Sequence, residues 1–151
     1  MKDELGLLLP VSYQNLRDAR QCPEVGLTIY AIGEIEKGQI GYRVDPNGNS
    51  LIGDGDRWRH NWIVIGHEDL CGDPIFIDTE SGDMPVLTAV HGQGSWESNL
   101  IAKSAVAFFA SVDVVNSVRQ GSSDAESGLT RIAEENAGCD IDLEFWSLLL
   151  E

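Results

Sequence analysis

Between residues 58 and 109, apolar residues occur in short runs, and these runs are the strongest indication of secondary structure in the chain. Three of them, 62–66, 72–78 and 85–92, contain many β-branched and aromatic side chains and are separated by Gly, Asp, Ser and Pro. This pattern predicts three successive antiparallel strands. Because apolar residues stand at consecutive positions within the runs, we expect both faces of the sheet to be covered.

The segment before these runs predicts one helix and one or two further strands. Pro10 followed by 11–20 without an internal breaker is typical of a short helix. Residues 27–32 have the composition of a first strand, and 40–44 of a second. Between them, 34–39 predicts a turn of helix or a polar loop.

The pattern after the strands changes to helical periodicity. A helix is expected from Ser98 or Asn99 to Gln120, because its apolar residues recur at helical spacing. A second helix is predicted to begin at the capping-box sequence 123–126. A last short helix is predicted from residue spacing i, i+4, i+7, i+8, at Ile141, Phe145, Leu148 and Leu149. This order predicts one α+β domain over residues 1–151, a mostly antiparallel sheet of about five to six strands flanked by helices.

The composition agrees with a globular protein and adds an unusual charge. The chain has 151 residues, 42% of them hydrophobic, and a net charge of −15. Residues 1–60 carry nine acids and seven bases, whereas 61–151 carry sixteen acids and three bases. Such a field repels nucleic acid and anionic lipid and attracts a basic protein. The alternative is that the charge serves solubility alone.

Cysteine usage and hydropathy predict a cytoplasmic protein. Cys22, Cys71 and Cys139 are widely spaced and form no CxxC pair, a pattern typical of reduced thiols. No apolar run approaches the roughly 20 residues that a membrane helix requires. The start of the chain lacks the long apolar stretch of a signal peptide, so neither secretion nor membrane insertion is expected.

The segment from Asp45 to Asp56 partly matches a calcium-binding loop. Asp45, Asn47 and Asn49 stand at positions 1, 3 and 5 of that pattern, where a hard cation needs oxygen ligands. However, Ser50 stands where the pattern has Gly, and Asp56 where it has Glu. These departures favour an ordinary turn, and a cation in the loop stays the alternative.

No motif predicts a catalytic residue, a metal ligand or a cofactor. His60, His67 and His91 have no i, i+4 partner, so a zinc site would need distant segments to converge. Asp73 and Asp78 are interpreted as turn and strand-end residues. An enzyme would require a pocket in which His91 meets one of these carboxylates.

A tryptophan between basic and acidic neighbours suggests a contact point for a partner. Trp58, if partly exposed in its loop, could anchor another protein. The alternative is a tryptophan folded over the edge of the sheet. With the acidic residues of nearby loops it gives the candidate partner-binding set, which is Asp54, Asp56, Trp58, Glu68, Asp69, Asp83 and Glu97.

The strand region also carries an ordered series of small motifs. A Trp-led strand ends in Ile65-Gly66, Gly72-Asp73 precedes the next strand, and Pro85-Val86 opens the third. With Phe108-Phe109 in the helix and the segment 9–13 at the start, this series resembles the SUKH superfamily, which includes fungal cell-wall-assembly regulators and many bacterial proteins. The resemblance marks eight residues as a structural signature: Trp62, Gly66, Gly72, Asp73, Asp78, Pro85, Val86 and Phe108.

The resemblance implies an antiparallel sheet flanked by helices and no catalytic site. Its bacterial members are commonly immunity proteins that neutralise toxins, often nucleases. A nuclease is basic where it binds phosphates, so an acidic inhibitor would associate with it quickly. We therefore predict a binding protein for a basic toxin domain, without nucleic-acid or membrane partners. A regulatory scaffold is the alternative, and a small hydrolase or metal-dependent enzyme is a more remote one.

Overall fold

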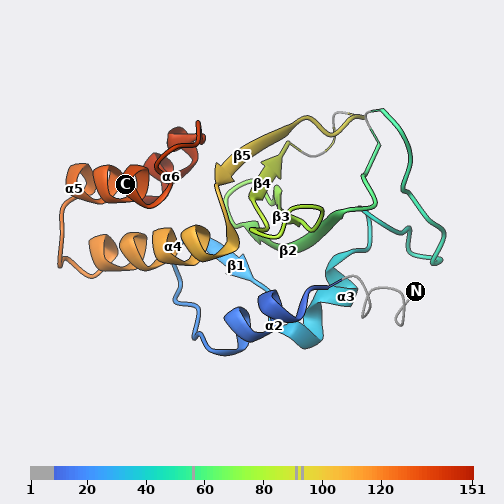
Figure 1. Cartoon of the computed structure of the whole chain (residues 1–151), viewed down its shortest axis with the longest axis horizontal. Coiled ribbons are helices and arrows are strands. Elements are labelled where there is room, and N and C mark those ends of the chain that lie inside the picture. The colour runs from blue at the N-terminus through green and yellow to red at the C-terminus, as the bar shows by residue number, and fades with distance from the viewer. Residues whose placement is uncertain (1–8, 56, 91, 93) are drawn as a thin grey trace.

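Five strands that follow one another along the chain form a single antiparallel sheet in the order β1-β2-β3-β4-β5 (Figure 1). They are seen in a computed structural model that describes residues 9–55, 57–90, 92 and 94–151. The predicted α+β fold, a mostly antiparallel sheet flanked by helices, is confirmed. The strands are β1 (Leu27–Ile29), β2 (Trp62–Glu68), β3 (Pro74–Asp78), β4 (Val86–Ala89) and β5 (Ser98–Ala102).

Among the residues that the structure describes, one helix precedes β1, a short helical pair lies between β1 and β2, and three helices follow β5. Figure 1 shows α4, α5 and α6 together to the left of the sheet, whereas α2 and α3 lie below it. None of the helices among the described residues is long and apolar enough to cross a membrane. The helical elements are α2 (Val11–Asp18), η1 (Ile32–Glu34), α3 (Ile35–Gly38), α4 (Ala105–Arg119), α5 (Ala125–Glu135) and α6 (Leu143–Leu149).

Side chains on one face of the sheet pack against the helices, and we call this cluster the helix-face core. Alternate residues of a strand point to the same face, so Ile63 and Ile65 of β2 lie beside Ile75 and Ile77 of β3. The helices contribute fully buried aromatic and aliphatic side chains to it, namely Tyr13, Phe108, Phe109, Val112 and Trp146.

The opposite face carries a second cluster, the loop-face core. The residues between those of the helix-face core, Trp62 and Val64 of β2 and Phe76 of β3, point to this side. Trp58, from the loop before β2, packs onto them and is only 1% exposed. Both faces of the sheet are therefore covered, as the consecutive apolar positions predict.

Polar side chains fix the loop that covers this second face. The Gln39 amide donates to the carbonyl oxygen of Val64 (2.7 Å) and accepts from its N–H (3.0 Å), so it pairs with β2 as another strand would. Arg43 donates to the carbonyl oxygens of His60 and Trp62 at 2.7 and 2.8 Å. Burial of all these groups makes their pairing a condition for folding.

The predicted strand at 40–44 is wrong. The amide N–H groups of Tyr42 and Arg43 both donate to the carbonyl oxygen of Gln39, at 3.0 Å each, which closes a tight turn. Gly41 adopts a φ of +92° there, a conformation that residues with a side chain rarely adopt. The apolar residues of this segment therefore serve a turn under the loop-face core and do not form a sheet strand.

The predicted helix start at Ser98 or Asn99 is also wrong. Both residues belong to β5 and pair with Ala89 and Thr88 of β4. The helix begins only after Ser104, whose side chain accepts a hydrogen bond from the N–H of Ala107 at 3.0 Å. The other two predicted helices form, and their side-chain caps come from Asp124 and Asp142.

Candidate protein-binding surface

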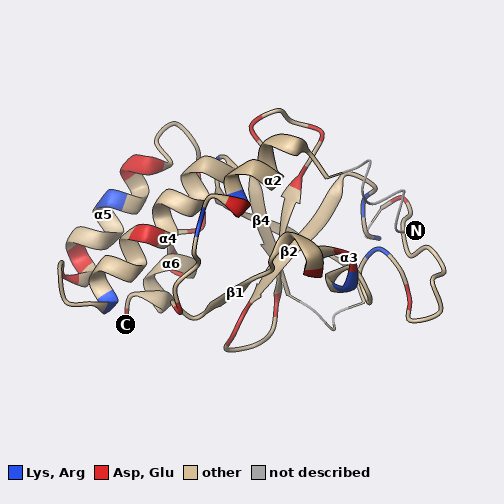
Figure 2. Ribbon diagram, turned by 90° about the horizontal axis from the view of Figure 1, so that it is seen from below, with Lys and Arg blue, Asp and Glu red and all other residues tan. Residues whose placement is uncertain are grey.

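The acidic residues predicted to bind a partner do not form one patch. Glu68 ends β2 and Asp69 begins the turn to β3, whereas Asp83 lies in the next turn, at the opposite end of the antiparallel sheet. Glu97 precedes β5, and Asp54 lies in the loop before β2. Asp56 lies outside the described residues. Figure 2 shows acidic residues spread over much of the ribbon, among few basic ones.

Trp58 does not have the exposure that a partner anchor requires. Its ring lies 4.8 Å from that of Phe76, 5.3 Å from that of Trp62 and 5.4 Å from that of Trp96, measured between centroids. Its indole N–H donates to the carbonyl oxygen of Trp62 at 3.0 Å. The idea of a partly exposed Trp58 is therefore wrong, and the alternative of a tryptophan folded over the sheet is correct.

The residues of the structural signature lie where they shape the sheet. Gly66 follows the bulge in β2, and a Cβ there would collide with the backbone of Thr28 in β1. Gly72 has a φ of +79° in the β2–β3 turn. Asp78 accepts from the side-chain amide of Asn61 at 2.6 Å and from the N–H of Glu80 at 2.9 Å.

The remaining signature residues are also placed within the fold. Trp62, Val86 and Phe108 are buried. The carbonyl oxygen of Pro85 accepts from the N–H of Asp78 at 3.0 Å, which joins β3 to β4. Asp73 directly precedes β3. All of these positions serve the sheet and its turns.

The loop that resembles a calcium site is closed by its own first residue. One oxygen of Asp45 accepts from the N–H groups of Asn47 (2.9 Å) and Asn49 (2.8 Å), and the other accepts from the Asn49 side chain (3.0 Å). These hydrogen bonds, that of the Asn49 side chain above all, lower the pKa of Asp45. Both carboxylate oxygens thus hold a turn.

The two carboxylates considered for an enzyme, Asp73 and Asp78, are not brought together. Asp73 and Asp78 flank the two ends of β3, and since a strand rises about 3.3 Å per residue, roughly 16 Å separates them. His91 lies outside the described residues. Within the described part of the chain, no three His, Cys, Asp or Glu side chains are arranged to hold a metal ion.

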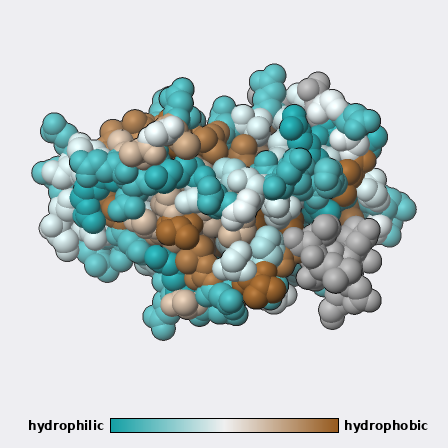
Figure 3. All heavy atoms as spheres, viewed as in Figure 1, coloured by the Kyte–Doolittle hydropathy of each residue, from teal (hydrophilic) through white to brown (hydrophobic). Residues whose placement is uncertain are grey.

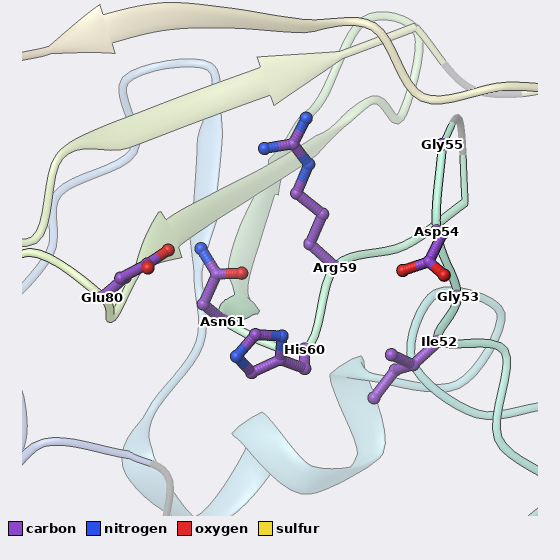
Figure 4. Close-up of a pocket in the computed structure, with 8 residues that line it drawn as sticks. All are labelled: Ile52, Gly53, Asp54, Gly55, Arg59, His60, Asn61 and Glu80. Carbon is purple, nitrogen blue, oxygen red and sulfur yellow. The ribbon is translucent and has the colours of Figure 1, made fainter.

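A pocket of about 400 Å³ lies beside Asp54 (Figure 4). Asp54 and Glu80 stand on opposite sides of it, with Arg59, His60 and Asn61 between them (Figure 4). The Arg59 guanidinium is placed over the ring of Trp62, with its central carbon 5.2 Å from the centroid. With two carboxylates and one guanidinium, this pocket offers little net charge to a basic partner.

A larger hollow of about 590 Å³, which we call the acidic groove, lies at the end of the sheet beside α6. Its walls are the β2–β3 turn on one side and α6 on the other, and Thr88, Val90 and Asn99 lie between them. Figure 3 shows hydrophobic side chains gathered over the α6 region of the molecule. The charged residues of the groove are Glu68, Asp69, Asp73, Asp142, Glu144 and Arg119, five carboxylates against one guanidinium.

Hydrogen bonds hold several of these carboxylates in place. Glu68 accepts from the N–H groups of Leu70, Cys71 and Asp73 at 2.8–2.9 Å, which closes the β2–β3 turn around its side chain. Asp142 accepts from the first N–H groups of α6 as its N-cap. Their negative charges are therefore fixed before any partner arrives, which lowers the entropy cost of binding.

A chain of polar side chains supports Asp69 at the rim. Its carboxylate accepts from the hydroxyl of Thr28 at 2.6 Å and lies 3.6 Å from Nε2 of His67. The other ring nitrogen of His67 is 3.0 Å from the hydroxyl of Tyr30. Burial raises the pKa of Tyr30, so its hydroxyl keeps its proton at neutral pH. The chain ties β1 to β2 and orients Asp69.

Half of the acidic groove was not predicted from the sequence. Glu68 and Asp69 belong to the predicted partner-binding set, whereas Asp142 and Glu144 do not. Leu148 was one of the apolar residues whose spacing predicted the last helix, and 55% of its surface is exposed. Its position after two acids on a short C-terminal helix is the signal that could have indicated a surface role.

The chain matches no protein-family model, no curated protein and no solved structure. The geometry and charge of the acidic groove are therefore the features of the described residues that bear on function.

Proposed function

We propose that this chain is a non-catalytic protein-binding module of the immunity-protein kind, which neutralises a basic toxin domain in the cytoplasm. One observation carries the proposal: five carboxylates and one guanidinium surround a groove that also contains exposed apolar side chains. The resemblance to the SUKH superfamily supports it independently, since many bacterial members are immunity proteins.

Charge complementarity raises the rate at which such a protein associates with its toxin. A toxin that cuts nucleic acid is basic where it contacts phosphates, so a net charge of −15 attracts it over long range. Electrostatic steering of this kind raises association rates by roughly ten- to a thousandfold at low salt. Rapid capture matters for an inhibitor, because the toxin is active until it is bound.

The test uses each candidate toxin domain that is encoded beside this gene. Co-expression is expected to restore growth of cells that produce the toxin, and the purified proteins should form a complex. Its association rate should fall about tenfold or more between roughly 0.05 and 0.5 M salt, while dissociation changes less. If no neighbouring toxin is neutralised by co-expression, the proposal is wrong.

A regulatory scaffold is a second candidate, and the apolar part of the groove favours it. Leu70 is 84% exposed and Leu148 is 55% exposed, an unusual pair in one hollow. A partner held mainly by such contacts would bind with an affinity that hardly depends on salt. The salt series described above therefore separates the two candidates.

A further inference from the structure

We infer that the acidic groove binds one amphipathic helix of the partner, with apolar side chains on the face that enters the groove and Lys or Arg along both of its edges. The inference rests on the proposed function and specifies which part of the partner is held. Three features of the groove carry it: its exposed apolar side chains, the distribution of its charges and the state of the neighbouring sheet edge.

Three apolar side chains in the groove are exposed to solvent. They come from separate elements: Leu70 from the β2–β3 turn, Val90 from the end of β4 and Leu148 from α6, with exposed fractions of 84%, 48% and 55%. Leaving apolar surface in water is unfavourable in free energy, in proportion to the exposed area. A row of partner side chains that covers these three would gain that free energy on binding.

The carboxylates come from the same two walls as Leu70 and Leu148. Glu68, Asp69 and Asp73 lie on the wall of the β2–β3 turn, and Asp142 and Glu144 lie on the wall of α6. A segment lying between the walls would meet negative charge on each side. This arrangement fits a helix with basic residues flanking an apolar stripe, the common form of peptide that binds in a groove.

The sheet edge beside the groove disfavours a partner that adds a strand. At β5, the carbonyl oxygen of Leu100 accepts from the N–H of Asp142 at 2.8 Å, and that of Ile101 accepts from the indole N–H of Trp146 at 2.7 Å. Both carbonyls already have donors from the α6 region. A helix, whose backbone hydrogen bonds are internal, needs none of these groups.

A second copy of this chain is a poor occupant by charge. It would bring the same net charge of −15 toward the five carboxylates of the groove. Like charges placed together across an interface repel each other and weaken binding. A basic partner has the opposite effect, which is why the inference specifies one.

Two exposed cysteines make the groove testable in the native protein. Cys71 lines the acidic groove, whereas Cys139 is exposed and does not line it. The probe is a peptide of about 18 residues, or about five helical turns, with Leu along one face and Lys elsewhere. A peptide of the same composition with its Leu spread around the helix is the control.

The expected result is selective protection of one thiol. At saturating peptide, alkylation of Cys71 by N-ethylmaleimide should slow about tenfold or more, corresponding to a site at least ~90% occupied. Alkylation of Cys139 should be unchanged, and the scrambled peptide should protect neither thiol.

Matched variants identify the surface. Leu148→Asp should abolish protection of Cys71, whereas Val106→Asp, which changes an equally exposed residue of α4 outside the groove, should not. Glu144→Lys should weaken peptide binding about fivefold or more, whereas Glu134→Lys in α5 should have a much smaller effect. Circular dichroism of each variant checks that it is folded.

Several outcomes would overturn the inference. Equal protection by the scrambled peptide would mean that charge alone drives binding, and a Cys71 that stays reactive with the peptide present would exclude the groove. Protection that rises with protein concentration alone, together with a dimer in analytical ultracentrifugation, would indicate a second copy.

The same readout separates this inference from the proposed function. If the toxin is neutralised and captured but Cys71 remains reactive in the complex, the groove is the wrong surface and the proposed function stands. If the peptide protects Cys71 but no neighbouring toxin is neutralised, the groove is a helix-binding site and the proposed function fails.

Discussion

The two faces of the sheet are covered by different means. On one face, helices from α2 to α6 contribute buried side chains to the helix-face core. On the other, an irregular segment between α3 and β2 lies over the loop-face core, with Trp58 at its centre. Helices satisfy their own backbone hydrogen bonds, but an irregular segment has to find partners elsewhere.

In the loop-face layer, two buried polar side chains supply such partners. Gln39 and Arg43 are almost fully buried in the loop-face layer, and both bond to backbone atoms of β2 or of the residues just before it. On the helix face, most backbone groups find hydrogen-bond partners within the helices, and caps such as Ser104 supply partners at the helix ends. The loop-face layer should therefore be the more sensitive to single polar changes.

The largest effect is expected from removing the centre of the loop-face core. Trp58→Ala leaves a cavity among four aromatic rings, those of Tyr42, Trp62, Phe76 and Trp96, so it should lower the free energy of unfolding by about 3–5 kcal/mol. Urea denaturation followed by circular dichroism measures the change.

Trp96→Ala is the matched control, because Trp96 belongs to the same cluster but is only half-buried. Its cost should be clearly smaller than that of Trp58→Ala. If Trp58→Ala lowered the free energy of unfolding by less than about 1 kcal/mol, the segment between α3 and β2 would contribute little to stability. The comparison of the two faces would then be wrong.

A smaller effect is expected at Gln39, and it tests the polar half of the comparison. Gln39→Ala removes two hydrogen bonds to Val64 and leaves a buried N–H and C=O without them, at a cost of about 2 kcal/mol. Hydrogen exchange of the Val64 amide should accelerate more than that of its neighbours in β2. Gln14→Ala, which removes one bond from a half-buried amide to the Leu9 carbonyl, should cost far less. Equal losses for the two glutamines would contradict this.

The sequence predicted the elements whose side chains follow a simple period. The runs around Trp62, Phe76 and Val86 became strands, and the helices near residues 11–20 and 123–136 formed as expected. The helix start at Ser98 was misplaced because Leu100 and Ile101 fit a helical stripe as well as a strand. The local sequence pattern does not distinguish a helix from a strand at these residues. Pairing with β4 makes them a strand.

The candidate site was predicted less completely, for a physical reason. A groove is made by elements distant in the chain, so Glu68 and Asp69 could be chosen as surface acids, but their meeting with Glu144 and Leu148 depends on the packing of α6. Trp58 was misjudged because its loop composition says nothing of the aromatic rings beneath it. The charge of the sequence predicted a basic partner, but the position of the candidate binding surface depends on the fold.

The smallest effect is expected on the helix face, at the cap of α4. Ser104→Ala removes the hydrogen bond that its side chain accepts from the N–H of Ala107, at a cost of about 1 kcal/mol. Ser104→Asp should retain stability, because a carboxylate accepts the same bond and interacts favourably with the helix dipole. Ser123→Ala, beside α5 but not its cap, should change the urea midpoint very little. A Ser104→Ala loss as large as that of Gln39→Ala would mean that the helix-face layer depends on single polar contacts as strongly as the loop-face layer does.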